Sequence, residues 1–104
     1  MATPLRLHTG PGEDGTTVVR AAGELDLSNV AQFSEALDTA VRSGADGTPV
    51  RVDLTRIEYL DSGAINVLFD HADSIDVLVN PVLMSVLTIS GLVKVTTVAA
   101  APAE

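Results

Sequence analysis

Ser62, His8 and His71 are the first side chains to consider for catalysis, because a serine beside a histidine can act as a nucleophile. Ser62 and His71 are nine residues apart on one predicted helix, which places them about 180° apart around its axis at 3.6 residues per turn. They therefore cannot form a nucleophile and base pair. His8 lies in the region of the first predicted strand, far from His71 in the sequence, so a metal site shared by the two histidines would require the fold to bring them together by coincidence.

Paired carboxylates and glycine-rich loops are the other patterns that could carry chemistry. Glu24 and Asp26 could share a strand face as an acid–base pair, but exposed acids beside a turn are a far commoner explanation. Gly10, Gly12 and Gly15 precede a strand and not a helix, so they match neither a phosphate-binding loop nor a dinucleotide fingerprint. We therefore expect no enzyme, no catalytic residue, no metal and no cofactor.

The balance of charge limits the partners. Six Lys and Arg residues against fourteen Asp and Glu residues give a net charge of -8, which argues against nucleic acid or an anionic bilayer as a partner. A basic or neutral protein surface suits this chain better. The absence of cysteine excludes disulfides and thiolate zinc sites and is compatible with a cytosolic protein.

The same sequence predicts one cytoplasmic domain. A chain of 104 residues is close to the usual size of a single domain. Its N-terminus has no apolar run of signal-peptide length, so we expect the mature chain to begin there. The uncharged stretch 77–93 is too short and too interrupted by polar residues to span a membrane, so we expect no membrane segment.

Asp61 and Ser62 lie where a predicted strand meets a predicted helix. Alternating apolar residues at 50, 52 and 54 predict the strand, and an apolar stripe at 65, 68, 69 and 72 predicts the helix. An Asp or Ser oxygen at this junction can cap the free amides of the first helical turn. A hydroxyl there is also exposed, and a phosphate on it would meet the positive end of the helix dipole.

Similar patterns along the chain predict a mixed α/β fold. The expected order is β-β-α-β-α-β-α-β, which gives a mainly parallel sheet with an N-terminal hairpin. Charged residues at alternate strand positions, including Arg51, Asp53 and Asp76, favour helices mainly on one face. We expect one domain over residues 1–98 and a frayed tail over 99–104. The expected strands are 5–7, 16–22, 50–54, 75–79 and 93–98, and the expected helices begin near residues 30, 62 and 81.

The helix at 81–90 has an outward face without charge. A helical wheel at 100° per residue predicts that Met84, Ser85 and Thr88 point outward with Pro81. The same wheel places Val82, Leu83, Val86, Leu87 and Ile89 on the core side. The outward face is either an ordinary, slightly apolar surface or a face for a partner or for self-association.

Three segments in order resemble one known family. These are residues 23–26 before the first helix, 52–54 leading into 59–62, and 79–81 before a helix that ends at 90–92. Together they resemble a STAS domain of the anti-sigma factor antagonist type, over residues 5–98. The resemblance implies a bacterial cytoplasmic switch protein that binds an anti-sigma factor with a kinase-like ATPase fold and so releases a sigma factor.

In that family a serine or threonine at the start of the second helix is phosphorylated by the partner, which ends binding, and a phosphatase resets it. The family motif is Asp-Ser-Ser/Thr-Gly-Leu. Aligned without a gap, Asp61 and Ser62 match its first two positions and Gly63 occupies the phosphoacceptor position. Deleting one residue would make Ser62 the acceptor, but it would shift Leu68 and Phe69 out of helical phase.

Two hypotheses for control follow from this departure. Either phosphorylation of Ser62 switches binding off, or the domain binds constitutively or is controlled elsewhere, for example at Thr3. The partner contact is expected at Asp26, Asp61, Ser62 and Gly63, with Asn29 and Asn66 as neighbours. The alternative function is a scaffold or ligand-sensing module that self-associates. We expect a monomer or a weak homodimer.

Overall fold

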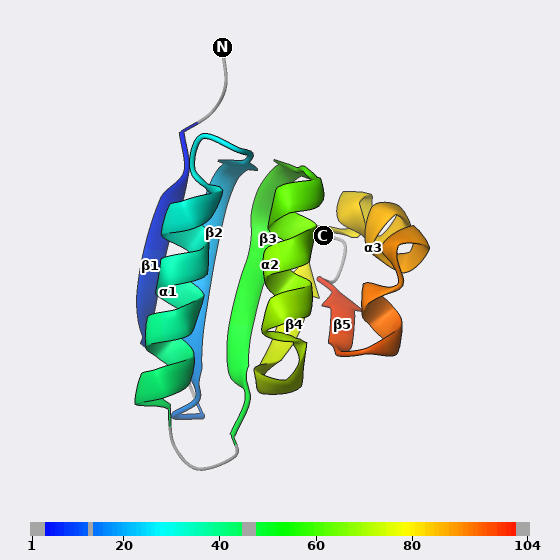
Figure 1. Cartoon of the computed structure of the whole chain (residues 1–104). Coiled ribbons are helices and arrows are strands. Elements are labelled where there is room, and N and C mark those ends of the chain that lie inside the picture. Colours follow the sequence, from blue (N-terminus) through cyan, green and yellow to red (C-terminus); the bar gives the residue numbers. More distant parts are fainter. Residues whose placement is uncertain (1–3, 13, 45–47, 102–104) are drawn as a thin grey trace.

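The computed structural model describes residues 4–12, 14–44 and 48–101. Within them, five strands form one sheet in which spatial order repeats chain order (Figure 1). The first two strands pair antiparallel as a hairpin, and each later strand pairs parallel with the one before it. The predicted mixed, mainly parallel sheet with an N-terminal hairpin is therefore confirmed. The strands are β1 (Arg6–Pro11), β2 (Thr17–Leu25), β3 (Val50–Leu60), β4 (Ile75–Val79) and β5 (Thr97–Ala100).

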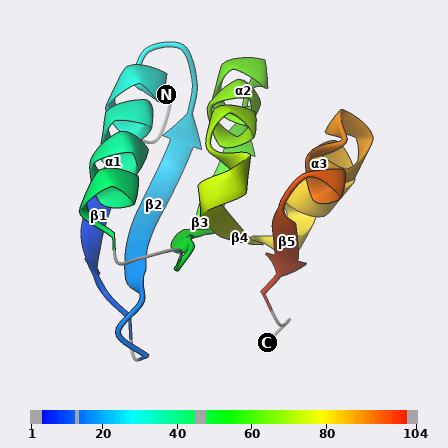
Figure 2. The same ribbon diagram turned by 60° about the horizontal axis from the view of Figure 1, so that its bottom comes forward.

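The helices cover one face of this sheet, as predicted. α1 (Val30–Ser43) and α2 (Ser62–Asp70) lie side by side on it, and α3 (Met84–Ser90) lies beside β4 and β5 (Figures 1 and 2). Single 3-10 turns precede β4, α3 and β5. No helix among the described residues has the length and apolar character needed to cross a membrane.

Alternation along the strands directs the core toward the helices. In β3, Val50, Val52 and Leu54 are buried, whereas Arg51 between them is exposed. Phe33 of α1 is fully buried against this face. The opposite face of the sheet remains open to solvent, as its charged residues predicted.

β3 does not keep strict alternation over its whole length. After Leu54 the next buried residues are Ile57 and Leu60, at intervals of three. The pairing of β2 with β3 shows a register shift at each of these places. Such bulges re-aim the following side chains, so Arg56 lies opposite Ala22 of β2.

The predicted faces of the helix at 81–90 are wrong in part. Val82, Val86 and Ile89 are 67%, 40% and 83% exposed, and Met84 packs against the core instead of pointing outward. The chain forms a 3-10 turn over Pro81–Leu83 before α3 begins. Because a 3-10 turn rotates by 120° per residue, a wheel drawn at 100° from residue 81 loses phase.

The C-terminal boundary also differs from the prediction. Leu92–Lys94 forms a 3-10 turn, and β5 runs over Thr97–Ala100 instead of 93–98. The backbone N–H of Ala101 then donates to the carbonyl of Val79 at 2.8 Å. Residues 99 and 100 therefore lie in β5 and Ala101 bonds to β4, where a frayed tail was predicted, while 102–104 lie outside the described residues.

Candidate functional site

The ends of β2 and β3 bring the predicted contact residues together. Leu25 and Leu60 pair in register at the carboxyl end of these parallel strands, and the N–H of Asp61 donates to the carbonyl of Leu25 at 3.1 Å. Asp26 follows one strand and Asp61 follows the other, so both lie at one edge of the sheet. α1 and α2 also begin at this edge (Figure 1).

Asp61 is the residue that caps α2. Its backbone is extended, with φ -97° and ψ -178°, and its Oδ1 accepts a hydrogen bond from the N–H of Ala64 at 3.1 Å. Ser62 is the first residue of α2 and is exposed. Its hydroxyl has no hydrogen-bond partner among the described residues. Of the two candidate caps in the sequence, the structure therefore selects Asp61.

Gly63 has little free space for a side chain. A Cβ atom added there would lie 3.3 Å from Oδ1 of Asp61 and 3.6 Å from Cδ2 of Leu27. Leu27 itself is 82% exposed, an unusual position for a leucine that borders a helix start. The sequence interpretation missed Leu27, although it is the apolar residue of the segment 26–29, between strand and helix.

The loop from β2 to α1 is held by its own polar side chains. Oδ1 of Asp26 accepts from the N–H of Ser28 at 2.9 Å, and Oδ1 of Asn29 accepts from the N–H of Asp26 at 3.0 Å. The amide of Asn29 also donates to the carbonyl of Glu24 at 2.9 Å. Asp26 and Asn29 thus shape this loop, whereas Asn66 is exposed on α2, one turn beyond Ser62.

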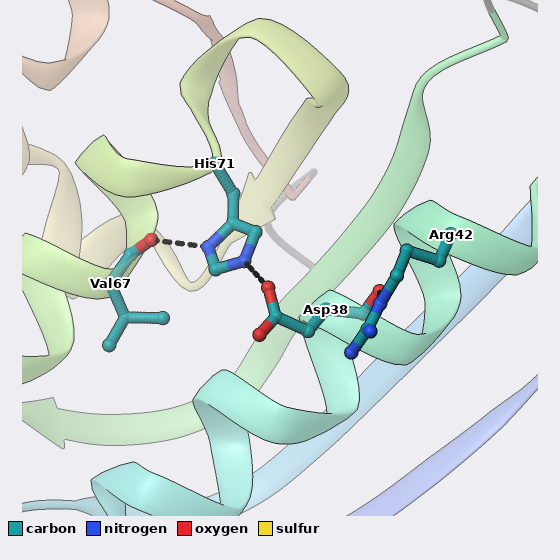
Figure 3. A network of polar contacts seen from close by, with 4 residues as sticks. All are labelled: Asp38, Arg42, Val67 and His71. Carbon is teal, nitrogen blue, oxygen red and sulfur yellow. Dashed lines mark hydrogen bonds and ion pairs between the residues drawn. The ribbon is translucent and has the colours of Figure 1, made fainter.

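His71 connects α1 and α2 away from the site (Figure 3). It is the C-cap residue of α2, and its Nε2 lies 2.8 Å from Oδ1 of Asp38 on α1. Its Nδ1 lies 2.8 Å from the carbonyl oxygen of Val67. Both neighbours are acceptors, so both contacts are hydrogen bonds when the imidazole carries two protons. We call this arrangement the His71 clasp; it occupies His71 at the opposite end of α2 from Ser62.

The surroundings of His71 change its pKa and that of Asp38. Burial of the imidazole would lower the pKa of His71, but hydrogen bonds to Val67 and Asp38 and the charges of Asp38 and Asp70 outweigh it and raise that pKa. The hydrogen bond from His71 in turn lowers the pKa of the Asp38 carboxyl. The His71 clasp therefore favours the charged form of both partners.

The site offers contact surface more than reactive groups. The exposed Leu27, the acidic residues Asp26 and Asp61 and the start of α2 lie together at the sheet edge. The N–H groups of Ser62 and Gly63 have no acceptor among the described residues, as is usual in a first helical turn. Three or more His, Cys, Asp or Glu side chains do not gather within reach of one metal ion in the described part of the chain.

Comparison with protein families and solved structures gives a consistent result. The profile of one family, described as Mlab, STAS domain, matches residues 9–98. Among curated proteins, none matches this chain.

Several solved structures share the fold. An anti-sigma factor antagonist from Mycobacterium paratuberculosis is 19% identical, with a TM-score of 0.81 over 95% of this chain and 90% of the other. The unphosphorylated form of the anti-sigma factor antagonist SpoIIAA is 23% identical, with a TM-score of 0.71 over 93% and 89%. The phosphorylated form of SpoIIAA, from Bacillus, has a TM-score of 0.65 at 23% identity over 93% and 92%.

Proposed function

Because the chain belongs to the STAS domain family, we propose that it is an anti-sigma factor antagonist that binds a kinase-fold anti-sigma factor in the cytoplasm. Binding occupies the anti-sigma factor and so releases a sigma factor to transcription. The domain contributes a docking surface and no catalysis in this proposal. Solved structures named as anti-sigma factor antagonists have the same fold, which supports this role.

The observation that carries the proposal is the exposed contact surface at the ends of β2 and β3. Leu27 is exposed beside Gly63. A Cβ atom at position 63 would lie within van der Waals contact of Cδ2 of Leu27. Asp26 and Asp61 border it with negative charge, which suits a neutral or basic partner surface. An apolar side chain bordered by polar groups matches the apolar centre and polar rim of protein interfaces.

Control by phosphorylation differs from the family pattern in this proposal. SpoIIAA exists in a phosphorylated and an unphosphorylated form, whereas Gly63 has no hydroxyl at the position of the family phosphoacceptor. Ser62 is exposed at the start of α2, and a phosphate there would add about -1.5 to -2 charges beside Asp61. We favour constitutive binding, or control at a residue other than Ser62. Thr3, which the sequence offers as one such residue, lies outside the described residues.

The test measures partner binding with three single variants. The partner is first captured from a lysate with the wild-type domain, identified by mass spectrometry, purified and titrated by calorimetry. Leu27→Asp places a charge in the proposed interface, so we expect Kd to rise about 30-fold or more, equivalent to about 2 kcal/mol. Ile89→Asp, an equally exposed apolar position on α3, should leave Kd unchanged.

Ser62→Asp distinguishes the two modes of control. Equal binding by wild type and Ser62→Asp supports a constitutive antagonist, and loss of binding supports a switch at the helix start. Capture of no ATPase of kinase-like fold would contradict the antagonist function, and full affinity in Leu27→Asp would contradict the assigned contact surface.

A second candidate function rests on the exposed apolar residues of α3 and the turn before it. Val82, Val86 and Ile89 are exposed without any charged residue between Asp76 and Lys94. This surface supports a scaffold that assembles by self-association. Analytical ultracentrifugation over a range of concentrations would then show an oligomer that Ile89→Asp abolishes and Leu27→Asp does not.

A further inference from the structure

The open face of the sheet carries most of the positive charge of this acidic chain. Arg6, Arg20, Arg51 and Arg56 are four of its six basic residues, and all four lie on strands. Three of them, together with His8, line one hollow of about 410 Å³. The hollow is therefore a local positive site on a protein of net charge -8.

Strand pairing explains how the hollow forms. Arg6 of β1 and Arg56 of β3 both pair with Ala22 of β2, so they lie on either side of a small side chain. Neighbouring strands are about 4.8 Å apart, which separates the two arginine backbones by about 10 Å. His8 and Arg20 pair two residues further along. Long cationic side chains thus surround a floor formed by an alanine.

The first bulge in β3 is what places Arg56 there. Val52 and Leu54 face the helices, so uninterrupted alternation would turn residue 56 toward the helices as well. The register shift between Arg20 and Ala22 instead makes Ile57 the next buried residue and turns Arg56 to the open side. Bulges are frequent beside binding sites, where they re-aim a side chain.

The positive charge in the hollow is only partly balanced. Asp53 is the carboxylate of its lining, and its Oδ1 already accepts from the hydroxyl of Thr55 at 2.7 Å. Its Oδ2 lies 4.0 Å from Nε of Arg20. Within the described residues, Arg6 and Arg56 have no carboxylate within 4.0 Å. Three guanidinium groups therefore face one carboxylate.

We infer that this hollow binds a small phosphate-bearing molecule, with Arg6 and Arg56 holding the phosphate between them and Arg20 beside it. Guanidinium groups bind phosphate oxygens through paired, charge-assisted hydrogen bonds. The volume lies within the range usual for small-ligand pockets. This inference is independent of the proposed function, because the hollow lies on the open face and not at the helix starts.

A small ligand fits better than a macromolecule. The same face also carries Asp53 and Asp76, and Glu58 lines the neighbouring hollow. Nucleic acid, an anionic membrane or an acidic protein would meet these carboxylates and the overall charge of -8. A compact anion in the hollow meets three arginines and one carboxylate, Asp53.

The neighbouring hollow could hold the rest of such a molecule. It has a volume of about 490 Å³ and shares Arg6 and Arg56 with the first. Gly23 and Asn80 also line it, and an amide side chain can hydrogen-bond a base or a sugar. A ligand with a phosphate in the first hollow and an organic group in the second would use both.

The test titrates the full chain with sodium pyrophosphate, and separately with ADP, at constant ionic strength. Binding is followed by calorimetry and by amide chemical shifts. Shifts should centre on Ala22 and Thr55, and Arg6→Gln and Arg56→Gln should each raise Kd about tenfold, as expected for loss of one charge-assisted contact. Arg42→Gln on α1, on the other side of the sheet, is the matched control. All three arginines are exposed, so the variants should fold, which circular dichroism can check.

The outcomes separate specific binding from general charge attraction. Tighter binding of ADP than of pyrophosphate would assign a nucleotide-like ligand that uses both hollows, and equal binding would assign the phosphate alone. The inference is overturned if neither probe gives saturable shifts at Ala22, or if Arg42→Gln weakens binding as much as Arg56→Gln.

Discussion

Replacing Asp61 by alanine separates the cap of α2 from the exposed hydroxyl beside it. The substitution removes one hydrogen bond, the 3.1 Å contact from the N–H of Ala64 to Oδ1 of Asp61. The two main-chain bonds of residue 61, to Leu25 and from Ile65, do not need a side chain and should remain. The loss is therefore that of a helix cap alone.

The expected cost is about 1 kcal/mol in the free energy of unfolding, the typical cost of replacing an Asp cap by Ala. For a domain of this size that corresponds to a fall in Tm of about 4–8 °C. Asp61→Asn keeps a capping oxygen and should stay close to wild type. Ser62→Ala removes an exposed hydroxyl without a described partner, so its effect should lie within about 0.5 kcal/mol.

Urea unfolding followed by far-ultraviolet circular dichroism measures all three variants. Their unfolding slopes should match that of wild type, because the buried surface does not change. If Ser62→Ala cost as much as Asp61→Ala, or if Asp61→Asn failed to restore stability, the assignment of the cap to Asp61 would be refuted.

Two further predictions concern the His71 clasp and the end of α3. The pKa of His71 is raised above its ordinary value of 6.5 in the folded protein. The stabilisation of the fold by the His71 clasp is therefore complete below pH 6.5 and is lost as pH rises through the folded pKa. The urea midpoint of wild type should therefore fall from pH 6 to pH 8 relative to His71→Gln, and parallel profiles would contradict this. Gly91 has φ +88° with open space around its Cβ position, so Gly91→Ala should cost about 1 kcal/mol from backbone strain alone. An unchanged urea midpoint would contradict that reasoning.

Regular alternation made the centre of the fold predictable. Val50, Val52 and Leu54 predicted a strand with one buried face, and the charged residues between them predicted the open face of the sheet. The strand ends then placed Asp26 and Asp61 at one edge, as expected for neighbouring parallel strands. These features follow from the alternation of residues along a strand and from the positions of the strand ends, and the folded structure keeps both.

The errors arose where the local period changes. The wheel for 81–90 failed because the chain begins with a 3-10 turn, and because α3 lies at the edge of the molecule and buries only part of its surface. Two adjacent capping residues cannot be ranked from sequence. The end of β3 at Leu60 leaves Asp61 extended, and this geometry decides between Asp61 and Ser62.

The arginine hollow could not be predicted, because it depends on a bulge. The available signal was the break in apolar spacing from Leu54 to Ile57. A change from intervals of two to intervals of three within one strand indicates that a side chain has changed face. It does not indicate which strand lies beside it, and so the meeting of Arg6 with Arg56 required the structure.

The strand order of the sheet has a consequence for how the protein is made. Each strand pairs with its predecessor in the chain, so no strand must be inserted between two that are already paired. A chain synthesised from its N-terminus can add each strand to an existing edge. At each stage only the outer strands have unpaired backbone groups, which limits the surface through which a growing chain can associate with others.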